Sequence, residues 1–372
     1  MTDTHDSLGT AASRAATLAA WANSPTRFRE DANAEEDLLL GGYADRWLVE
    51  LAQNAADAAQ RAGAPGRLLV RVVPGSGDGP AELWVANTGA PLDAAGVAAL
   101  ASLRASSKRD SESVGRFGVG FAAVLGVTAE PRIASTEGGV VFSAARTAAE
   151  VTALGGVAAE ELGRRGGRPP VLRLCWPLPV GEPGPRQGYA TEVRLPLSGV
   201  DPGELLAAAE SAAADLLLAL PWLAEITVAH PDGPAAAHRR IDHPDGTVTL
   251  EPGAARWLLA RRSGRWDESR RGDRQGGAEP GGGPRGGRGP VLDPGGRAVE
   301  DRAHWAVCWA VPLDADGRPR PLEEDVLHAP TPSDERLALP ARLLASVPMQ
   351  PSRRRIRTGP ATDAVLAEAA TV

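Results

Sequence analysis

The clearest pattern of apolar and polar positions in the chain lies between residues 46 and 62. At about 100° per residue, the polar side chains share one helical face, which carries Glu50, Gln53, Asn54, Asp57 and Arg61. The opposite face carries Leu48, Leu51, Ala52, Ala55 and Ala59. The pattern predicts an amphipathic helix whose polar groups point in one direction.

Further helical and strand-like patterns follow along the chain. Helices are predicted over residues 1–20, 93–104, 117–127, 202–220 and 363–370. Runs rich in β-branched and aliphatic residues predict strands over 67–73, 82–86, 131–135, 140–144, 171–176, 190–197, 225–229, 247–251, 255–261 and 303–312. The glycine- and proline-rich residues 74–80 predict a hairpin connection between the first two strands. A chain of 372 residues has room for about two domains.

Residues 263–299 consist largely of glycine, arginine, proline and aspartate, with Trp266 as the single aromatic side chain. Such a composition buries too little apolar surface to order, so we predict a disordered insertion. Repeated Arg/Gly tracts with aromatic residues can bind RNA, but this short tract favours a solvated loop. The helical pattern over 363–370 then stops, which indicates a longer protein or a tail that orders against something else.

Charge and cysteine content narrow the functional classes. The net charge of −7 gives no general reason to expect a nucleic-acid partner, which calls for a basic face. Cys175 and Cys308 alone cannot build a disulfide framework or a structural zinc site, which fits a reducing cytoplasm. The longest apolar run, residues 216–224, is too short to span a bilayer, and residues 1–30 contain no secretory signal. We therefore expect a cytoplasmic protein without a membrane role.

Two polar residues of the predicted helix over 46–62 suit nucleotide chemistry. A carboxylate such as Glu50 can act as general base when it reaches an attacking water. One turn later, Asn54 offers a neutral oxygen of the kind that Mg²⁺ binds while retaining several waters. On its own, such a helix is more often a surface helix with a solvated polar face. From the helix alone, a nucleotide site and a solvated surface helix both stay open.

Gly115, Gly118 and Gly120 lie where the predicted helix over 117–127 begins. Unpaired N–H groups and the positive dipole end of a helix start can hold phosphate oxygens. With 43 glycines in 372 residues, a G-x-x-G-x-G pattern is expected by accident about 0.6 times, so its context has to carry the argument. The polar stretch over 105–114 suits a mobile lid. It contains Lys108, the single lysine of the chain, and a phosphate contact and a chance occurrence explain this lysine equally well.

Four motifs in a fixed order carry a resemblance to a known superfamily. They are Glu50-x-x-x-Asn54-x-x-Asp57, Asn87-Thr88-Gly89, residues 115–121 and residues 190–197. They resemble the N, G1, G2 and G3 boxes of the GHKL ATPases, which include gyrase, heat-shock protein 90 chaperones and histidine kinases. The third motif is most similar to heat-shock protein 90, and residues 24–31 with 48–58 resemble bacterial proteins that carry a sacsin-type N-terminal ATP-binding domain. The match covers residues 25–230.

The resemblance implies a Bergerat fold. This is an α+β two-layer sandwich, with a mixed and mostly antiparallel sheet covered by helices on one face, followed by a second, smaller α/β domain. The implied segments are an N-terminal segment over 1–24, an ATP-binding domain over 25–200, and a middle or transducer-like domain over 201–262 and 300–372, with the insertion over 263–299 inside it. The implied cofactors are ATP and Mg²⁺.

The resemblance also implies roles for individual residues. Glu50 would be the general base and Asn54 the Mg²⁺ ligand, with Asp57 near the base and sugar. Gly89 would let the base approach closely, and Thr191 would reach adenine through a water. The remaining nucleotide contacts would come from the glycine motif and the polar stretch before it, namely Ser107, Lys108, Gly115, Phe117, Gly118, Val119, Gly120 and Phe121.

Asn87 departs from the superfamily pattern, in which an aspartate accepts the amino proton of adenine. Pro91 likewise stands where a second glycine is usual, a variant similar to that of sacsin-type domains. An amide can accept from the adenine amino group, but it can also rotate and donate to a carbonyl. We therefore expect Asn87 to read adenine with weaker discrimination against guanine than a carboxylate would provide.

Three functions from different classes are compatible with these residues. The first is a chaperone-like conformational switch driven by slow ATP hydrolysis, with protein clients or self-association as partners. In it, an arginine between Arg353 and Arg357 reaches the γ-phosphate, although a solvated basic surface explains that run more simply. The second is a nucleotide-binding regulatory module without turnover, against which Glu50 counts. A histidine-kinase-like phosphotransferase is disfavoured, because no histidine precedes the motifs in an acceptor-helix pattern.

Overall fold

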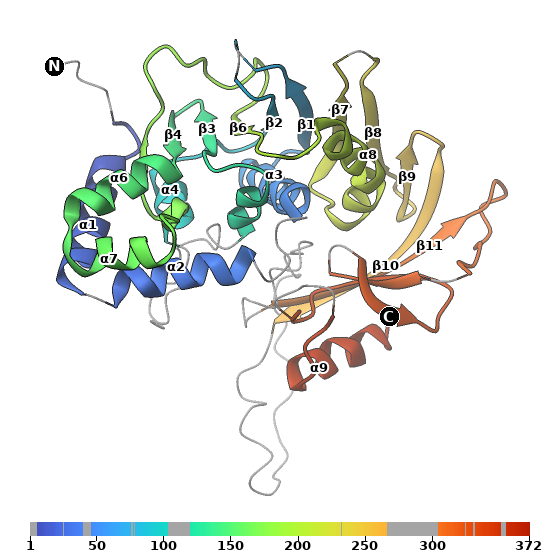
Figure 1. Ribbon diagram of the computed structural model, residues 1–372. Helices are drawn as coiled ribbons and strands as arrows, with labels where there is room; N and C mark the ends of the chain where they lie inside the picture. Colours follow the sequence, from blue (N-terminus) through green and yellow to red (C-terminus); the bar gives the residue numbers. More distant parts are fainter. Residues whose placement is uncertain are drawn as a thin grey trace, which may run out of the picture. The chain divides into compact units, whose positions relative to one another are not determined.

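The computed structural model describes residues 6–24, 26–39, 46–75, 77, 79–102, 120–231, 233–265, 304–323, 325–329, 332–350 and 355–372. The chain divides into two compact units (Figure 1). The N-terminal unit comprises Met1–Leu217 and Trp222–Arg239, and the C-terminal unit comprises Leu218–Pro221 and Arg240–Val372. This division differs from the predicted boundary at residue 200, because the strand Leu223–Ala229 pairs in parallel with Gly66–Val73 and so joins the first unit.

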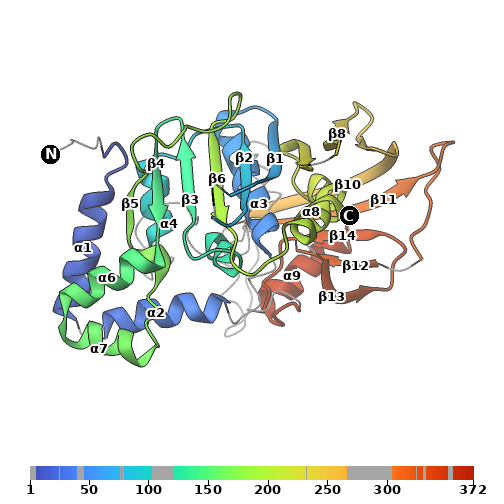
Figure 2. The ribbon, with the colours of Figure 1, turned by 45° about the horizontal axis from the view of Figure 1, so that its top comes forward.

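The N-terminal unit is built on a mixed sheet, most of which can be followed in Figure 2. Its strands are β1 (Gly66–Val73), β2 (Glu82–Asn87), β3 (Arg132–Ser135), β4 (Gly138–Phe142), β5 (Cys175–Pro177), β6 (Thr191–Pro196), β7 (Leu223–Ala229) and the start of β8 (Ala236–Asp242). They are ordered β8-β7-β1-β2-β6-β3-β4-β5. β1 and β7 run parallel, whereas the other pairs are antiparallel. The expected mixed, mostly antiparallel sheet is therefore confirmed.

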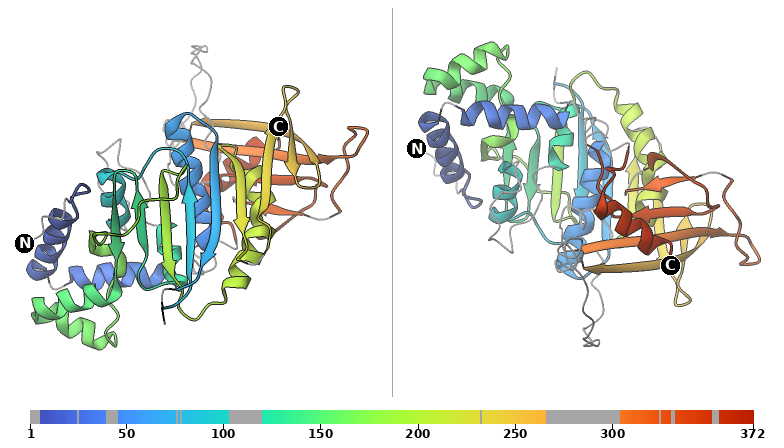
Figure 3. Two further views of the ribbon diagram at one scale, coloured as in Figure 1. Left: turned by 90° about the horizontal axis from the view of Figure 1, so that it is seen from above. Right: turned by 90° about the horizontal axis from the view of Figure 1, so that it is seen from below.

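The helices of this unit pack on the sheet or against one another. They are α1 (Thr10–Asn23), α2 (Arg27–Leu38), α3 (Trp47–Ala62), α4 (Ala94–Ala101), α6 (Ala144–Leu154), α7 (Gly156–Arg164) and α8 (Pro202–Ala219). α3 packs against β1, β2 and β7, and the two views in Figure 3 show it on one face of the sheet. Gly66 permits close packing of β1 on α3, since a Cβ added at this residue would lie 2.7 Å from the Cβ of Ala59. The α+β sandwich class is confirmed.

Several elements differ from the sequence patterns. The helix expected over 117–127 is described only from Gly120, and it continues as the 3-10 helix η3 (Ala122–Gly126). The strand expected over 171–176 begins instead as the 3-10 helix η4 (Val171–Arg173). The patterns also do not predict α2, α6, α7, β8, β12 (Asp325–His328), β13 (Pro332–Leu337) or β14 (Arg342–Ala345). Residues 171–173 form the 3-10 helix η4 because of a side chain on α2, which is distant in sequence.

That side chain is Glu35, which is buried beneath η4. Its carboxylate accepts the backbone N–H groups of Val171 at 2.6 Å and Leu172 at 2.9 Å. Burial nevertheless raises the pKa of Glu35 to about 7, because the desolvation of the charge outweighs these hydrogen bonds and the nearby Arg173 guanidinium. Glu35 thus ties α2 to η4 and titrates near neutrality.

We expect Glu35 to make the free energy of unfolding fall as pH rises from about 4.5 to about 7. In this window the unfolded chain releases the proton of this carboxyl group while the folded chain retains it, and the total loss is at most about 3 kcal/mol. Urea denaturation of wild type and Glu35→Gln on both sides of the window measures it. The difference in the free energy of unfolding between wild type and Glu35→Gln should change with pH. A difference that is the same on both sides of the window would contradict the prediction. Glu36→Gln is the matched control, because Glu36 pairs with Arg165 near the surface.

The C-terminal unit contains a second set of strands and one helix. They are β9 (Thr247–Glu251), β10 (Ala255–Arg265), β11 (His304–Leu313), β12 (Asp325–His328), β13 (Pro332–Leu337), β14 (Arg342–Ala345) and α9 (Pro360–Ala369). Their order is β13-β12-β14-β11-β10-β9. β10 extends to Arg265, past the expected start of the insertion at residue 263, because its last residues pair with β11. The remainder of that expected insertion lies outside the described residues.

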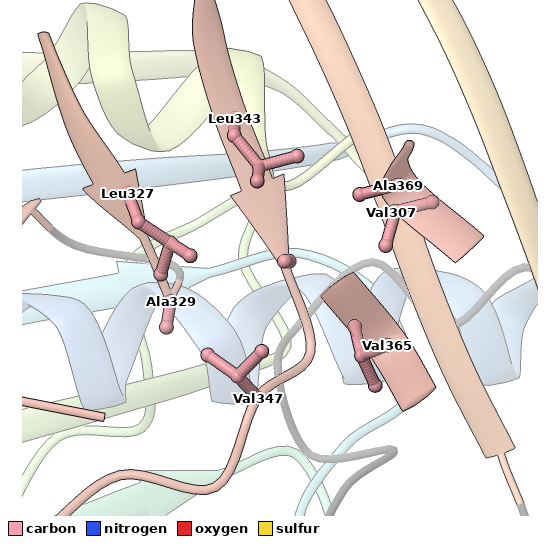
Figure 4. Close-up of a cluster of buried hydrophobic side chains, with 8 residues drawn as sticks. Val307, Leu327, Ala329, Leu343, Val347, Val365 and Ala369 are labelled. Atoms are coloured by element: carbon pink, nitrogen blue, oxygen red, sulfur yellow. The ribbon is translucent and has the colours of Figure 1, made fainter. Parts of the chain in front are cut away.

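α9 completes the core of this unit (Figure 4). The cluster combines Val365 and Ala369 of α9 with apolar side chains of β11, β12, β14 and the segments that follow them, namely Val307, Leu327, Ala329, Leu343, Ala345 and Val347. The indole N–H of Trp309 donates to the carbonyl of Ala369 at 2.8 Å. The helical pattern near residue 370 therefore forms a helix that packs on its own sheet.

Candidate functional site

A pocket in the N-terminal unit lies between α3 and the sheet. Most of its lining is apolar and comes from α3, β1, β2, α4, β3, β6 and the segments beside them, namely Leu51, Ala58, Leu68, Val85, Ala90, Leu92, Leu100, Phe121, Ile133 and Val193. Its polar lining consists of Asn54, Arg61, Asn87 and Thr191. An apolar cavity with a few convergent polar groups is the usual form of a small-molecule site.

α3 presents Leu51, Asn54, Ala58 and Arg61 to the pocket. This refines the grouping in the sequence pattern, which counts Leu51 with the apolar face although it lies only about 60° around the helix from Asn54. The polar face is also not solvated as a whole, because Glu50 and Gln53 are each 3% exposed. Asp57 is half-buried and is not among the lining residues, so its role beside the base stays a prediction. The stripe of α3 that lines the pocket therefore combines Leu51 of the apolar group with Asn54 and Arg61 of the polar group.

Glu50 lies one turn before Asn54 in a constrained position. A Cβ added at Gly120 would lie 2.0 Å from its Oε2, so the end of the glycine motif touches this carboxylate. Its Oε1 lies 3.9 Å from Nε of Arg46, an ion pair too long for a hydrogen bond. Within the described part of the chain, this buried Oε1 has no hydrogen-bond partner. A buried oxygen left in this state is able to accept a hydrogen bond from a bound water.

Asn87 ends β2, where it is paired with Thr191 of β6. Its Nδ2 donates to the carbonyl of Thr88 at 2.9 Å, and the hydroxyl of Thr88 in turn accepts the backbone N–H of Arg67. Rotation of the amide would therefore place Oδ1 against a carbonyl oxygen and lose a hydrogen bond. The bond to Thr88 thus orients Oδ1 as an acceptor and weakens the expectation that this amide rotates to suit guanine.

Gly89 allows the turn after β2 to lie directly on α3. Its φ is +109°, and an added Cβ would lie 2.5 Å from the backbone carbonyl carbon of Ala58. The N–H of Ala90 donates to the carbonyl oxygen of Ala58 at 2.9 Å. Any side chain at residue 89 would separate the turn from the helix and open the wall of the pocket.

The expected phosphate and lid residues are placed only in part. Ser107, Lys108, Gly115, Phe117, Gly118 and Val119 lie outside the described residues, and their roles stay predictions. Phe121 lines the pocket, buried against Phe142 at a ring-centroid distance of 6.1 Å. Arg61 lines the pocket too, although sequence reasoning assigned it no role. Its spacing of seven residues from Asn54 was the available signal, since it places both on one helical stripe.

The described residues do not form a protein cage for a metal ion. Within these residues, no group of three or more His, Cys, Asp or Glu side chains could hold one. The side-chain amide oxygen of Asn54 can therefore bind Mg²⁺ only if a phosphate-bearing molecule and water supply the other ligands. Among the helices within the described ranges, none combines the length and apolar character needed to cross a bilayer.

Comparisons with known proteins give likenesses to solved structures but no match to a family model or a curated protein. The structure is similar to the crystal structure of the B-subunit of the DNA gyrase from Myxococcus xanthus, with 10% sequence identity, a TM-score of 0.41 and 86% of each chain covered. A likeness at this TM-score carries no argument about function, which has to come from the pocket itself.

Proposed function

We propose that the N-terminal unit binds ATP with Mg²⁺ and hydrolyses it slowly. One observation carries the proposal: the pocket that holds Asn54, Asn87 and Thr191 lies one helical turn from a buried carboxylate that touches Gly120. Four motifs far apart in the sequence thus contribute residues to one region. A solvated surface helix would not bury Glu50 or place it against a glycine.

The pocket suits the base of the nucleotide. Its apolar walls accept a flat ring, and Oδ1 of Asn87 accepts a hydrogen bond from an exocyclic amino group. Adenine carries that amino group, whereas guanine presents a carbonyl at the same position. The bond from Nδ2 to Thr88 supports this choice, because it opposes rotation of the amide.

The phosphate end suits hydrolysis by an activated water. Mg²⁺, when bound to the phosphates, would neutralise charge that develops on them. Asn54 would contribute one oxygen to that ion, and Glu50 would orient the attacking water and take its proton through Oε1. Gly120 supports this assignment, because a side chain there would displace the carboxylate of Glu50.

The finer part of the proposal is a chaperone-like conformational switch. It is supported by the third motif, residues 115–121, which is most similar in sequence to that of heat-shock protein 90. The γ-phosphate contact from the run Arg353 to Arg357 remains a proposal, and Arg353 lies outside the described residues. A nucleotide-binding module without turnover is the second candidate. Oε1 of Glu50, which lacks a hydrogen-bond partner among the described residues, favours hydrolysis over it.

Asn54→Ala tests the metal-dependent part of binding. We expect it to weaken ATP binding in the presence of Mg²⁺ by about tenfold or more, because an oxygen beside a charged group is lost. Calorimetric titration with ATP, with Mg²⁺ and with a chelator, measures the effect, which should be smaller without metal. Gln60→Ala is the matched control, because Gln60 lies on α3 outside the pocket lining. Undiminished affinity of Asn54→Ala for Mg-ATP would remove the role of Asn54, and absence of ATP binding by wild type would refute the proposed function.

A further inference from the structure

Ser135 ends β3 behind the pocket, without lining it. Its buried hydroxyl donates to the carbonyl of Leu92 at 2.9 Å, and the N–H of Leu92 donates to Oγ1 of Thr191 at 3.2 Å. Ser135 and Thr191 are partners in the β3–β6 register. Two hydroxyls from neighbouring strands therefore hold both backbone groups of Leu92, whose side chain lines the pocket.

This arrangement sets the direction of the Thr191 hydroxyl. Because Oγ1 accepts the N–H of Leu92, the hydroxyl proton has to point elsewhere. Within the described residues, no hydrogen bond uses that proton, and Thr191 lines the pocket. The pocket thus offers a donor at Thr191 beside the acceptor Oδ1 of Asn87, on two paired residues.

We propose that Ser135 is a positioning residue for base selection, which acts by holding Leu92 so that Thr191 stays a donor to the base. The inference rests on the proposed function. Adenine matches an acceptor beside a donor, since its amino group donates and the adjacent ring nitrogen accepts, directly or through a water. Hypoxanthine reverses both groups, because it carries a carbonyl and a ring N–H. The pair therefore favours ATP over ITP.

Titrations of ATP and ITP against four proteins test this proposal. Wild type should prefer ATP, and Ser135→Ala should lower the ATP-to-ITP affinity ratio by about threefold to tenfold, equivalent to one hydrogen bond. Ser135→Thr retains a hydroxyl and should restore most of the ratio. Ser143→Ala is the matched control, because Ser143 is a buried serine at the end of a neighbouring strand that caps α6 instead of the pocket.

Hydrogen exchange provides a readout that needs no nucleotide. The amide of Leu92 should exchange at least about threefold faster in Ser135→Ala than in wild type, but not in Ser143→Ala. Binding of both nucleotides by a folded Ser135→Ala with an unchanged ratio, or unchanged exchange at Leu92, would overturn this proposal alone. If wild type bound neither nucleotide, the proposed function would fail, and the role of Ser135 in base selection with it.

Discussion

Replacing Glu50 with glutamine is expected to lower ATP turnover by about 100- to 10,000-fold while Mg-ATP still binds. Glutamine keeps the shape of the side chain beside Gly120, but its amide cannot take a proton from water. The buried Oε1, which has no hydrogen-bond partner within the described residues, is the atom that this substitution disables as a base. Phosphate release under saturating Mg-ATP measures turnover, and calorimetry measures binding by the same samples.

The comparison separates the two leading functions. Turnover that falls with unchanged affinity supports hydrolysis at Glu50, as expected for a group that acts in the transition state. Tight binding by both proteins, with wild-type turnover no greater than that of Glu50→Gln, would leave the binding module without turnover. Glu36→Gln serves as the control for loss of a carboxylate, since Glu36 lies on α2 away from the pocket lining.

Replacing Arg194 with leucine is expected to cost about 3–5 kcal/mol of the free energy of unfolding. Arg194 is 1% exposed and lies on β6, three residues after Thr191. Its guanidinium donates to Glu192 at 2.9 Å and to the carbonyls of Pro183 and Gly184. The guanidinium carbon also lies over Trp84, 4.3 Å from the ring centroid. Among the described residues, removing Arg194 leaves the carboxylate of Glu192, which is 0% exposed, with Arg71 at 3.3 Å as its remaining ion-pair partner.

Urea denaturation with a matched arginine tests this prediction. Arg164→Leu removes an arginine whose side chain is 57% exposed and which pairs with Glu160 and Glu161, so we expect a loss below about 1 kcal/mol. Arg194→Lys should recover only part of the loss, because an ammonium cannot reproduce the planar fork of donors. Equal losses for the exposed and the buried arginine would refute the prediction that Arg194 contributes more to the free energy of unfolding than Arg164 does.

Local patterns determined the elements around the pocket. The helical stripe over 46–62 became α3, which ends at Gly63 with a φ of 64°, and the aliphatic runs beside it became β1 and β2. These predictions succeeded because periodicity of 3.6 or 2 residues reflects burial of one face and can be read within a single segment. The four ordered motifs predict Glu50, Asn54, Asn87 and Thr191 as site residues, and the last three of these line the pocket.

Only the tertiary structure decided where these residues lie relative to one another. It buried Glu50 against Gly120, turned the stripe from Leu51 to Arg61 toward the pocket, and fixed the amide of Asn87 through Thr88. It also made residues 171–173 a 3-10 helix, because Glu35 captures two of their N–H groups from more than a hundred positions away. Such contacts join segments that are distant in sequence, so no local pattern contains them. The sequence by itself determined which chemical groups this protein carries, and the packing of α3 against the sheet decided which of them meet.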